Sequence, residues 1–173
     1  MDDYTLLADQ AGKLLAQESD FIANAANFAS LLYHGLADVN WAGFYFARAS
    51  GELVLGPFNG QPACTRLPAG RGVCGSAATT GTTVIVEDVD AFEDHIVCDT
   101  ASRSEIAVPL RLNHKLLGVL DIDSPKKSRF SREDRAGIER LAEVFLESVR
   151  CAAAIEQSAK IVSDKGVAEF PAG

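Results

Sequence analysis

The sequence lacks a surplus of basic residues, a long apolar run and any closely spaced pair of cysteines. Its 173 residues include 16 Lys and Arg against 24 Asp and Glu, a formal net charge of −8. This balance argues against nucleic acid as a partner, because phosphate binding needs a basic surface. No apolar run approaches the roughly 20 residues that span a bilayer, and the acidic start MDDYTLLADQ is unlike a secretory signal. We therefore expect a cytoplasmic protein with no nucleic-acid and no membrane partner.

An ordinary globular composition accompanies these absences. Hydrophobic residues make up 47% of the chain and charged residues 23%, without repeats or low-complexity stretches. A chain of this length suits about one domain and can bury a continuous core without disulfides or metals. We predict a single domain over residues 1–163 and a loosely ordered tail over 164–173, where little pattern is left.

Hydrophobic periodicity predicts helices at both ends of the chain and strands between them. The terminal helices are expected over 4–18, 20–34 and from Ser131 onward, the last with Asp134 at the capping-box position. The strands are expected over 39–48, 52–58, 63–67, 82–86, 104–112 and 115–123, with a short helix from Cys74 to Thr80. Short connections between most strands predict an α+β fold, a six-stranded antiparallel sheet with the N- and C-terminal helices packed on one face. Loops then cover the other face, which suits a pocket.

Alternation along the last two predicted strands brings three carboxylates together. The apolar alternate residues of both strands should face the core, which constrains the register and predicts Leu112 opposite Leu116, or a register slipped from it by an even number of residues. On the other face Glu105 then lies across from Asp123 and diagonal to Asp121, within about 5–8 Å. Their repulsion should raise at least one carboxyl pKa unless a substrate ammonium, a divalent metal or a basic side chain lies between them. A solvated acidic edge of the sheet is the alternative.

Two aromatic residues also share one face of a predicted strand. Trp41 and Tyr45 are four residues apart on the first strand. If they lie on the acidic face, their rings would attract an ammonium or a sulfonium-like group. Ordinary core aromatics are an equally weighted alternative.

Residues 70–75 read G-R-G-V-C-G, which matches the pattern G-x-G-x-x-G. The dinucleotide-binding interpretation requires a βαβ unit, and Pro68 separates the preceding strand from this loop. We therefore expect no nucleotide cofactor. The glycines and the start of the following helix could instead hold a carboxylate, and an anion site near an acidic cluster suits a free amino acid.

The chain contains four cysteines, and in a reducing compartment they favour catalysis, metal binding or redox chemistry over structural disulfides. None forms the C-x2-4-C spacing of a zinc site, so we expect no metal. Cys98 lies in a long polar loop over 87–103, where an accessible thiol is a good nucleophile. His95 nearby leaves a Cys–His site open. The cysteines are Cys64, Cys74, Cys98 and Cys151.

Six segments carry the most specific signal in the sequence: NWAGFYF, LVLGPFNG, GRGVCG, HIVCD, SEIAVPL and GVLDIDS, over about residues 40–124. In this order they resemble the free methionine-(R)-sulfoxide reductases, a family built on the GAF domain. The resemblance implies a GAF-like fold, reduction of free L-methionine-(R)-sulfoxide, a homodimer, thioredoxin as reductant and no cofactor. It implies that Cys98 is the nucleophile, that Cys64 resolves its sulfenic acid by forming a disulfide with it, and that Cys74 has an auxiliary role. The implied substrate-binding residues are Trp41, Tyr45, Glu105, Asp121 and Asp123.

The alternative function is a GAF sensory module that binds a small effector, because one fold can host many functions. Against it, 173 residues leave little room for an output domain.

Overall fold

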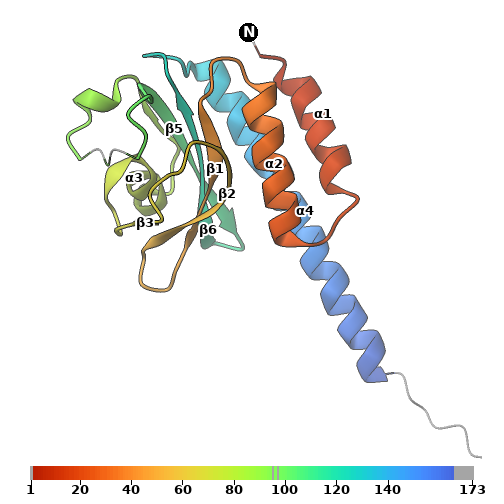
Figure 1. The fold of residues 1–173 in the computed structure, drawn as a ribbon. Helices are drawn as coiled ribbons and strands as arrows, with labels where there is room; N and C mark the ends of the chain where they lie inside the picture. Colours follow the sequence, from red (N-terminus) through yellow and green to blue (C-terminus); the bar gives the residue numbers. More distant parts are fainter. Residues whose placement is uncertain (1, 95, 97, 166–173) are drawn as a thin grey trace, which may run out of the picture.

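One antiparallel sheet organises the chain. The computed structural model describes residues 2–94, 96 and 98–165 (Figure 1). The six strands lie in the order β3-β2-β1-β6-β5-β4, and each pairs antiparallel with its neighbour. The predicted α+β sheet is therefore confirmed. The strands are β1 (Trp41–Ala47), β2 (Leu53–Gly60), β3 (Arg66–Leu67), β4 (Val84–Val86), β5 (Ser104–Leu112) and β6 (Lys115–Ser124).

The terminal helices cover one face of this sheet, as predicted. They are α1 (Tyr4–Leu15), α2 (Phe21–Gly35) and α4 (Arg132–Lys165). Figure 1 shows them on one side, with the short helix α3 (Gly72–Thr80), the 3₁₀ turn η1 (Val89–Ala91) and the loops on the other. No helix in the described part of the chain is both long and apolar enough to cross a membrane.

The helix boundaries follow from capping side chains. The carboxylate of Asp3 accepts from the N–H of Leu6 at 2.9 Å and begins α1. At α4 the predicted capping box is present, since the N–H of Ser131 donates to Asp134 Oδ2 at 2.8 Å and Ser131 Oγ accepts from the N–H of Asp134 at 3.2 Å. Helix α4 continues to Lys165, past the predicted domain boundary at residue 163. The rest of the predicted tail, over 166–173, lies outside the described residues, as does His95.

The β5–β6 hairpin reaches the predicted register by a different turn. Glu105 pairs with Asp123, which confirms the predicted pairing of the acids. The predicted pairing of Leu112 with Leu116 is wrong, because Leu112 pairs with Lys115 across a two-residue turn. That turn, Asn113–His114, has φ values of 50° and 66°, typical of the tight turns that match strand twist. A register shift between Leu110 and Arg111 then restores the pairing expected at the acids.

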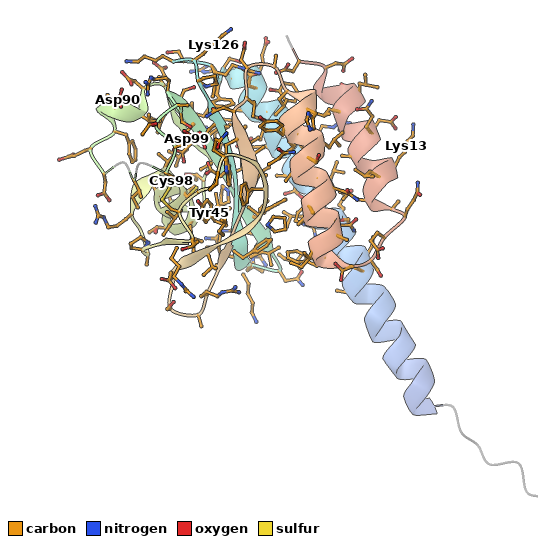
Figure 2. All side chains as sticks on the ribbon, viewed as in Figure 1. Lys13, Tyr45, Asp90, Cys98, Asp99 and Lys126 are labelled. Atoms are coloured by element: carbon orange, nitrogen blue, oxygen red, sulfur yellow. A yellow bond between two sulfur atoms is a disulfide. The ribbon has the colours of Figure 1, made fainter. Side chains whose placement is uncertain are left out.

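The two faces of the sheet contribute to two separate cores. Phe28, Phe44, Leu120 and Phe145 belong to the core between the sheet and the terminal helices. On the opposite face, the second core contains Trp41, Tyr45, Leu53, Val119 and Cys74. Figure 2 shows Tyr45, Cys98 and Asp99 on this second side, away from α1 and α2. The candidate site is built into this smaller core.

Candidate active site

The three central strands bring the predicted aromatic and acidic residues into neighbouring rows. Trp41 of β1 pairs with Asp123 of β6, which in turn pairs with Glu105 of β5. In the next row on this face, Asp121 lies between two small residues, Gly43 and Ala107. This answers the question left open by the sequence, because the aromatic and acidic residues share one face.

Gly43 makes room for the indole of Trp41. A Cβ at residue 43 would lie 2.8 Å from Cη2 of the Trp41 ring, closer than such atoms approach one another. The absent side chain therefore lets the indole lie across the sheet. Its ring centroid lies 5.9 Å from that of Tyr45, with an interplanar angle of 23°, so the two rings form a stacked wall.

A pocket that opens to solvent lies against this wall. It is lined by strand residues, by the beginning of α3 and by the loop that carries Cys98. Of the residues predicted from the sequence, the lining includes Trp41, Tyr45, Cys74, Cys98, Glu105, Asp121 and Asp123. The remaining predicted site residue, Cys64, is joined to the lining residue Cys98 by a disulfide.

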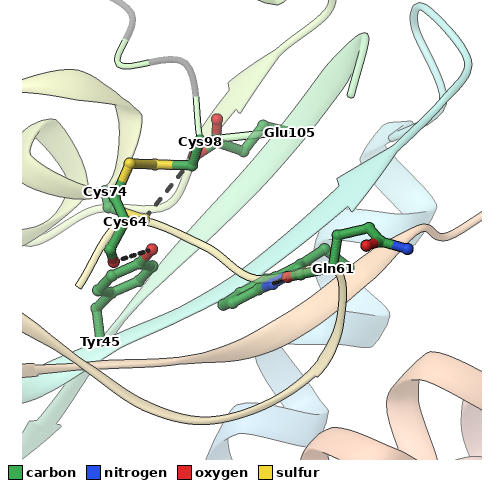
Figure 3. Close-up of a disulfide and its surroundings, with 7 residues drawn as sticks. Tyr45, Gln61, Cys64, Cys74, Cys98 and Glu105 are labelled. Atoms are coloured by element: carbon green, nitrogen blue, oxygen red, sulfur yellow. Dashed lines mark hydrogen bonds between the residues drawn. A yellow bond between two sulfur atoms is a disulfide. The ribbon is translucent and has the colours of Figure 1, made fainter. Parts of the chain in front are cut away.

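A disulfide joins Cys64 to Cys98 at the pocket (Figure 3). The two Cα atoms are 5.3 Å apart, although 34 positions separate the residues in the sequence. The pairing is the one that the family resemblance implies. The described chain is therefore the oxidised form of this cysteine pair.

The aromatic wall also holds the loop that carries Cys64. The hydroxyl of Tyr45 donates to the carbonyl oxygen of Cys64 at 3.0 Å. The indole N–H of Trp41 donates to the carbonyl oxygen of Gln61 at 3.1 Å. Both buried donors are thus satisfied by the same loop, which the two rings fix above the sheet.

The buried carboxyls favour their protonated forms. Burial raises the pKa of Glu105 well above its ordinary value, and the nearby charges of Asp121 and Asp123 raise it further. Burial raises the pKa of Asp121 to about 6, against the lowering effect of hydrogen bonds from Glu105 and Cys74. Desolvation and the charges of Asp121 and Asp99 also raise the pKa of Asp123. Glu105 and Asp123 therefore favour the protonated form more than ordinary carboxyls do, and a protonated carboxyl can donate its proton.

Cys74 belongs to the same cluster but is a poor nucleophile. Its side chain is buried, and its Sγ lies 3.8 Å from Oε1 of Glu105. Burial, followed by the neighbouring carboxylates, raises its thiol pKa well above the ordinary value. The thiol can therefore donate a hydrogen bond to the acids, and it forms a thiolate less readily than an ordinary cysteine.

Sequence reasoning missed the contacts that hold the Cys98 loop. The side-chain amide of Asn40 donates to Asp99 Oδ2 and to Ser102 Oγ, each at 3.1 Å. The backbone N–H of Asn40 donates to the carbonyl oxygen of Asp123 at 3.0 Å. Asp99 and Ser102 line the pocket. These partners lie 59 and 62 positions from Asn40, so local periodicity carries no signal for them.

Arg71 is the one basic side chain among the described lining residues, and sequence reasoning did not assign it to the site. Its guanidinium binds the carboxylate of Asp94 at 2.6 Å, in an exposed ion pair. Arg71 therefore lies at the solvent side of the pocket, and its charge is paired with Asp94. It does not neutralise the carboxyl groups on the pocket floor, which still repel one another.

Known proteins resemble the chain in sequence and in structure. Residues 20–147 match the model of the GAF domain family. The chain is 55% identical over 144 residues to protein YtsP of Bacillus subtilis, covering 83% of this chain and 88% of that protein. It is 50% identical over 128 residues to the free methionine-R-sulfoxide reductase of Escherichia coli, covering 74% of this chain and 77% of that protein. The X-ray structure of free methionine-R-sulfoxide reductase from Neisseria meningitidis in complex with its substrate has a TM-score of 0.84 at 42% identity, covering 88% of this chain and 91% of that chain.

Proposed function

This chain belongs to the free methionine-R-sulfoxide reductase family of GAF-domain proteins, and we propose that it reduces free L-methionine-(R)-sulfoxide through Cys98 and Cys64. The observation that carries this proposal is the disulfide between them beside a pocket lined with carboxyl groups and stacked rings. A reductase that cycles between dithiol and disulfide needs both sulfurs within bonding reach and a substrate site next to one of them.

The proposed reaction moves one oxygen and two electrons. In the reduced enzyme the Cys98 thiolate attacks the sulfoxide sulfur while a carboxyl group protonates the sulfoxide oxygen. The hydroxyl then passes from the sulfoxide sulfur to the sulfur of Cys98 while the sulfur–oxygen bond and the newly formed sulfur–sulfur bond break, so that methionine leaves and Cys98 becomes a sulfenic acid. The Cys64 thiol then attacks the sulfenic sulfur, water leaves, and the disulfide forms. An external dithiol returns both cysteines to the reduced state by exchange.

The carboxyl groups divide into proton donors and an ammonium acceptor. Burial and the neighbouring charges raise the pKa values of Glu105 and Asp123 well above the ordinary range, which favours their protonated forms. They supply the acid that the departing oxygen requires. Asp121, with a pKa of about 6, is largely ionised at neutral pH and accepts the substrate ammonium.

Selectivity for a free amino acid follows from this division. A free substrate carries an ammonium, whereas a peptide-bound residue offers only a neutral amide that cannot neutralise a buried carboxylate. The Trp41 and Tyr45 rings provide an apolar surface for the methyl and methylene groups beside the sulfoxide. At the mouth, the start of α3 offers backbone N–H groups to the substrate carboxylate.

The family resemblance also supports thioredoxin as the dithiol, a homodimer and a cytoplasmic location, where thiols are kept reduced. A coupled assay tests the function: the purified protein, thioredoxin, thioredoxin reductase and NADPH are mixed with free L-methionine-(R)-sulfoxide. We expect NADPH oxidation with this substrate and none with the (S) epimer or a peptide-bound sulfoxide. As a control, dithiothreitol should reduce the disulfide of the protein used. If that protein binds the sulfoxide but no NADPH is oxidised, the sensory alternative is favoured.

A further inference from the structure

Three side chains at the floor of the pocket lie close enough to share one cation. The Sγ of Cys74 and carboxylate oxygens of Glu105 and Asp121 all lie within 4.8 Å of one another. Cys74 Sγ and Glu105 Oε1 are 3.8 Å apart. Around a tetrahedral Zn²⁺, with bonds of about 2.3 Å to sulfur and 2.0–2.2 Å to oxygen, neighbouring sulfur and oxygen ligands lie about 3.5 Å apart. No pair of the three ligand atoms would therefore have to approach by more than about 1.3 Å.

An unpartnered oxygen points independently to a ligand. Asp121 is 6% exposed, and its Oδ1 has no hydrogen-bond partner among the described residues. Its strand neighbours in the row, Gly43 and Ala107, offer no polar side chain. A buried carboxylate oxygen without a donor is costly, and such groups in native proteins usually meet a ligand, an ion or water.

The local charge also favours a cation. The pocket is lined by Asp99, Glu105, Asp121 and Asp123, and Arg71 is already paired with Asp94 at the exposed side. Nothing basic among the described lining residues reaches the floor. A dication at that position would meet several acids at once in a partly desolvated site, where such attraction is strong.

We propose that the pocket floor binds a divalent cation of the Zn²⁺ class through Cys74, Glu105 and Asp121, and that this cation excludes the substrate. The sulfur ligand favours Zn²⁺ over Mg²⁺ or Ca²⁺, which prefer oxygen ligands alone. The Cys74 thiol loses its proton to solvent as the sulfur–metal bond forms, and water completes the tetrahedron. The exclusion of substrate rests on the proposed function, because the cation takes the place assigned to the substrate ammonium.

The oxidised protein gives a test that does not depend on reductase activity. With Cys64 and Cys98 held in their disulfide, the remaining thiols are Cys74 and Cys151, the second of which is exposed on α4. Cys151→Ser is the matched control, and in its oxidised form a sulfur ligand can come only from Cys74. Co²⁺ is added as a spectroscopic probe, and Zn²⁺ is titrated by calorimetry.

We expect Cys151→Ser to bind a single Zn²⁺ and, with Co²⁺, to show a thiolate-to-cobalt charge-transfer band that Zn²⁺ removes. Cys74→Ser and Asp121→Asn should weaken Zn²⁺ binding on the order of 100-fold. Loss of a residue that only hydrogen-bonds a metal ligand lowers metal affinity roughly 10–100-fold, and loss of a ligand itself should cost at least as much. Absence of the band in Cys151→Ser overturns the proposal even if Cys74→Ser does not fold. Equal Zn²⁺ affinity of a folded Cys74→Ser variant also overturns it.

A second measurement tests the exclusion of substrate. Saturating free L-methionine-(R)-sulfoxide should weaken Zn²⁺ binding to the oxidised protein, and in turnover Zn²⁺ should raise KM without changing kcat. Metal binding that is indifferent to the sulfoxide refutes the shared position. If the protein shows no reductase activity, the cobalt band still decides the metal site, so the two proposals fail separately.

Discussion

Reduction of the Cys64–Cys98 disulfide should make the folded protein markedly less stable. The bond closes a loop across 34 sequence positions. The loss of conformational freedom in the unfolded chain for a loop of that length is worth about 3.7 kcal/mol at 25 °C. For a protein of this size, that difference lowers the melting temperature by about 8–15 °C.

Urea unfolding of the oxidised protein and of the protein kept in dithiothreitol measures the difference directly. Cys64→Ser in the same two buffers is the control, and its midpoint should not depend on the reductant. A wild-type difference below about 1 kcal/mol would refute the reasoning, because it would mean that the native fold must distort to form the bond. A reduced protein that is more stable than the oxidised one would refute it more strongly.

Three further predictions follow from the site. Cys98→Ser should abolish turnover, whereas Cys64→Ser should still release about one methionine per site in a single-turnover experiment; equal activity of Cys98→Ser and wild type would remove the proposed nucleophile. Asp121→Asn should lower kcat/KM about 100-fold, in line with the roughly 2–5 kcal/mol that a buried charge partner is worth. Because burial raises the pKa of Asp121 to about 6, ionising it opposes folding, so wild type should lose stability relative to Asp121→Asn as pH rises from about 4 to about 6; parallel stability curves would contradict this. Asn40→Ala removes two hydrogen bonds to the Cys98 loop and should cost about 1–3 kcal/mol. It should also slow the disulfide step measured by quenched flow, while Asn40→Asp, which lacks both donors, should not restore the rate.

The acidic cluster could be predicted because it depends on local alternation. A strand with one buried face leaves little freedom of register, and the pairing of Glu105 with Asp123 follows from that constraint. The predicted pairing at the turn was wrong because Asn113 and His114 adopt left-handed conformations that the apolar pattern does not encode. The register shift between Leu110 and Arg111 restores the expected register, so the pairing of the acids is predicted correctly although the pairing at the turn is not.

Contacts between loops could not be predicted in the same way. The partners of Asn40 and the loop carbonyl that Tyr45 contacts depend on how irregular segments cross the sheet. Neither periodicity nor residue spacing encodes that path. The pairing of Cys64 with Cys98 likewise came from the family resemblance alone, since four cysteines allow several connectivities.

The two hydrogen-bond donors on the aromatic wall connect the candidate substrate pocket to the loop that carries Cys64. A ligand that tilts either ring must also pull on the segment from Gln61 to Cys64, because the indole and the phenol are tethered to it. In the proposed reaction, a sulfoxide bound against the rings would therefore also displace the loop that carries Cys64, the cysteine proposed to resolve the sulfenic acid. Tyr45→Phe would keep the ring but remove the hydrogen bond to Cys64. The expected variant binds the sulfoxide normally and forms the Cys64–Cys98 disulfide more slowly.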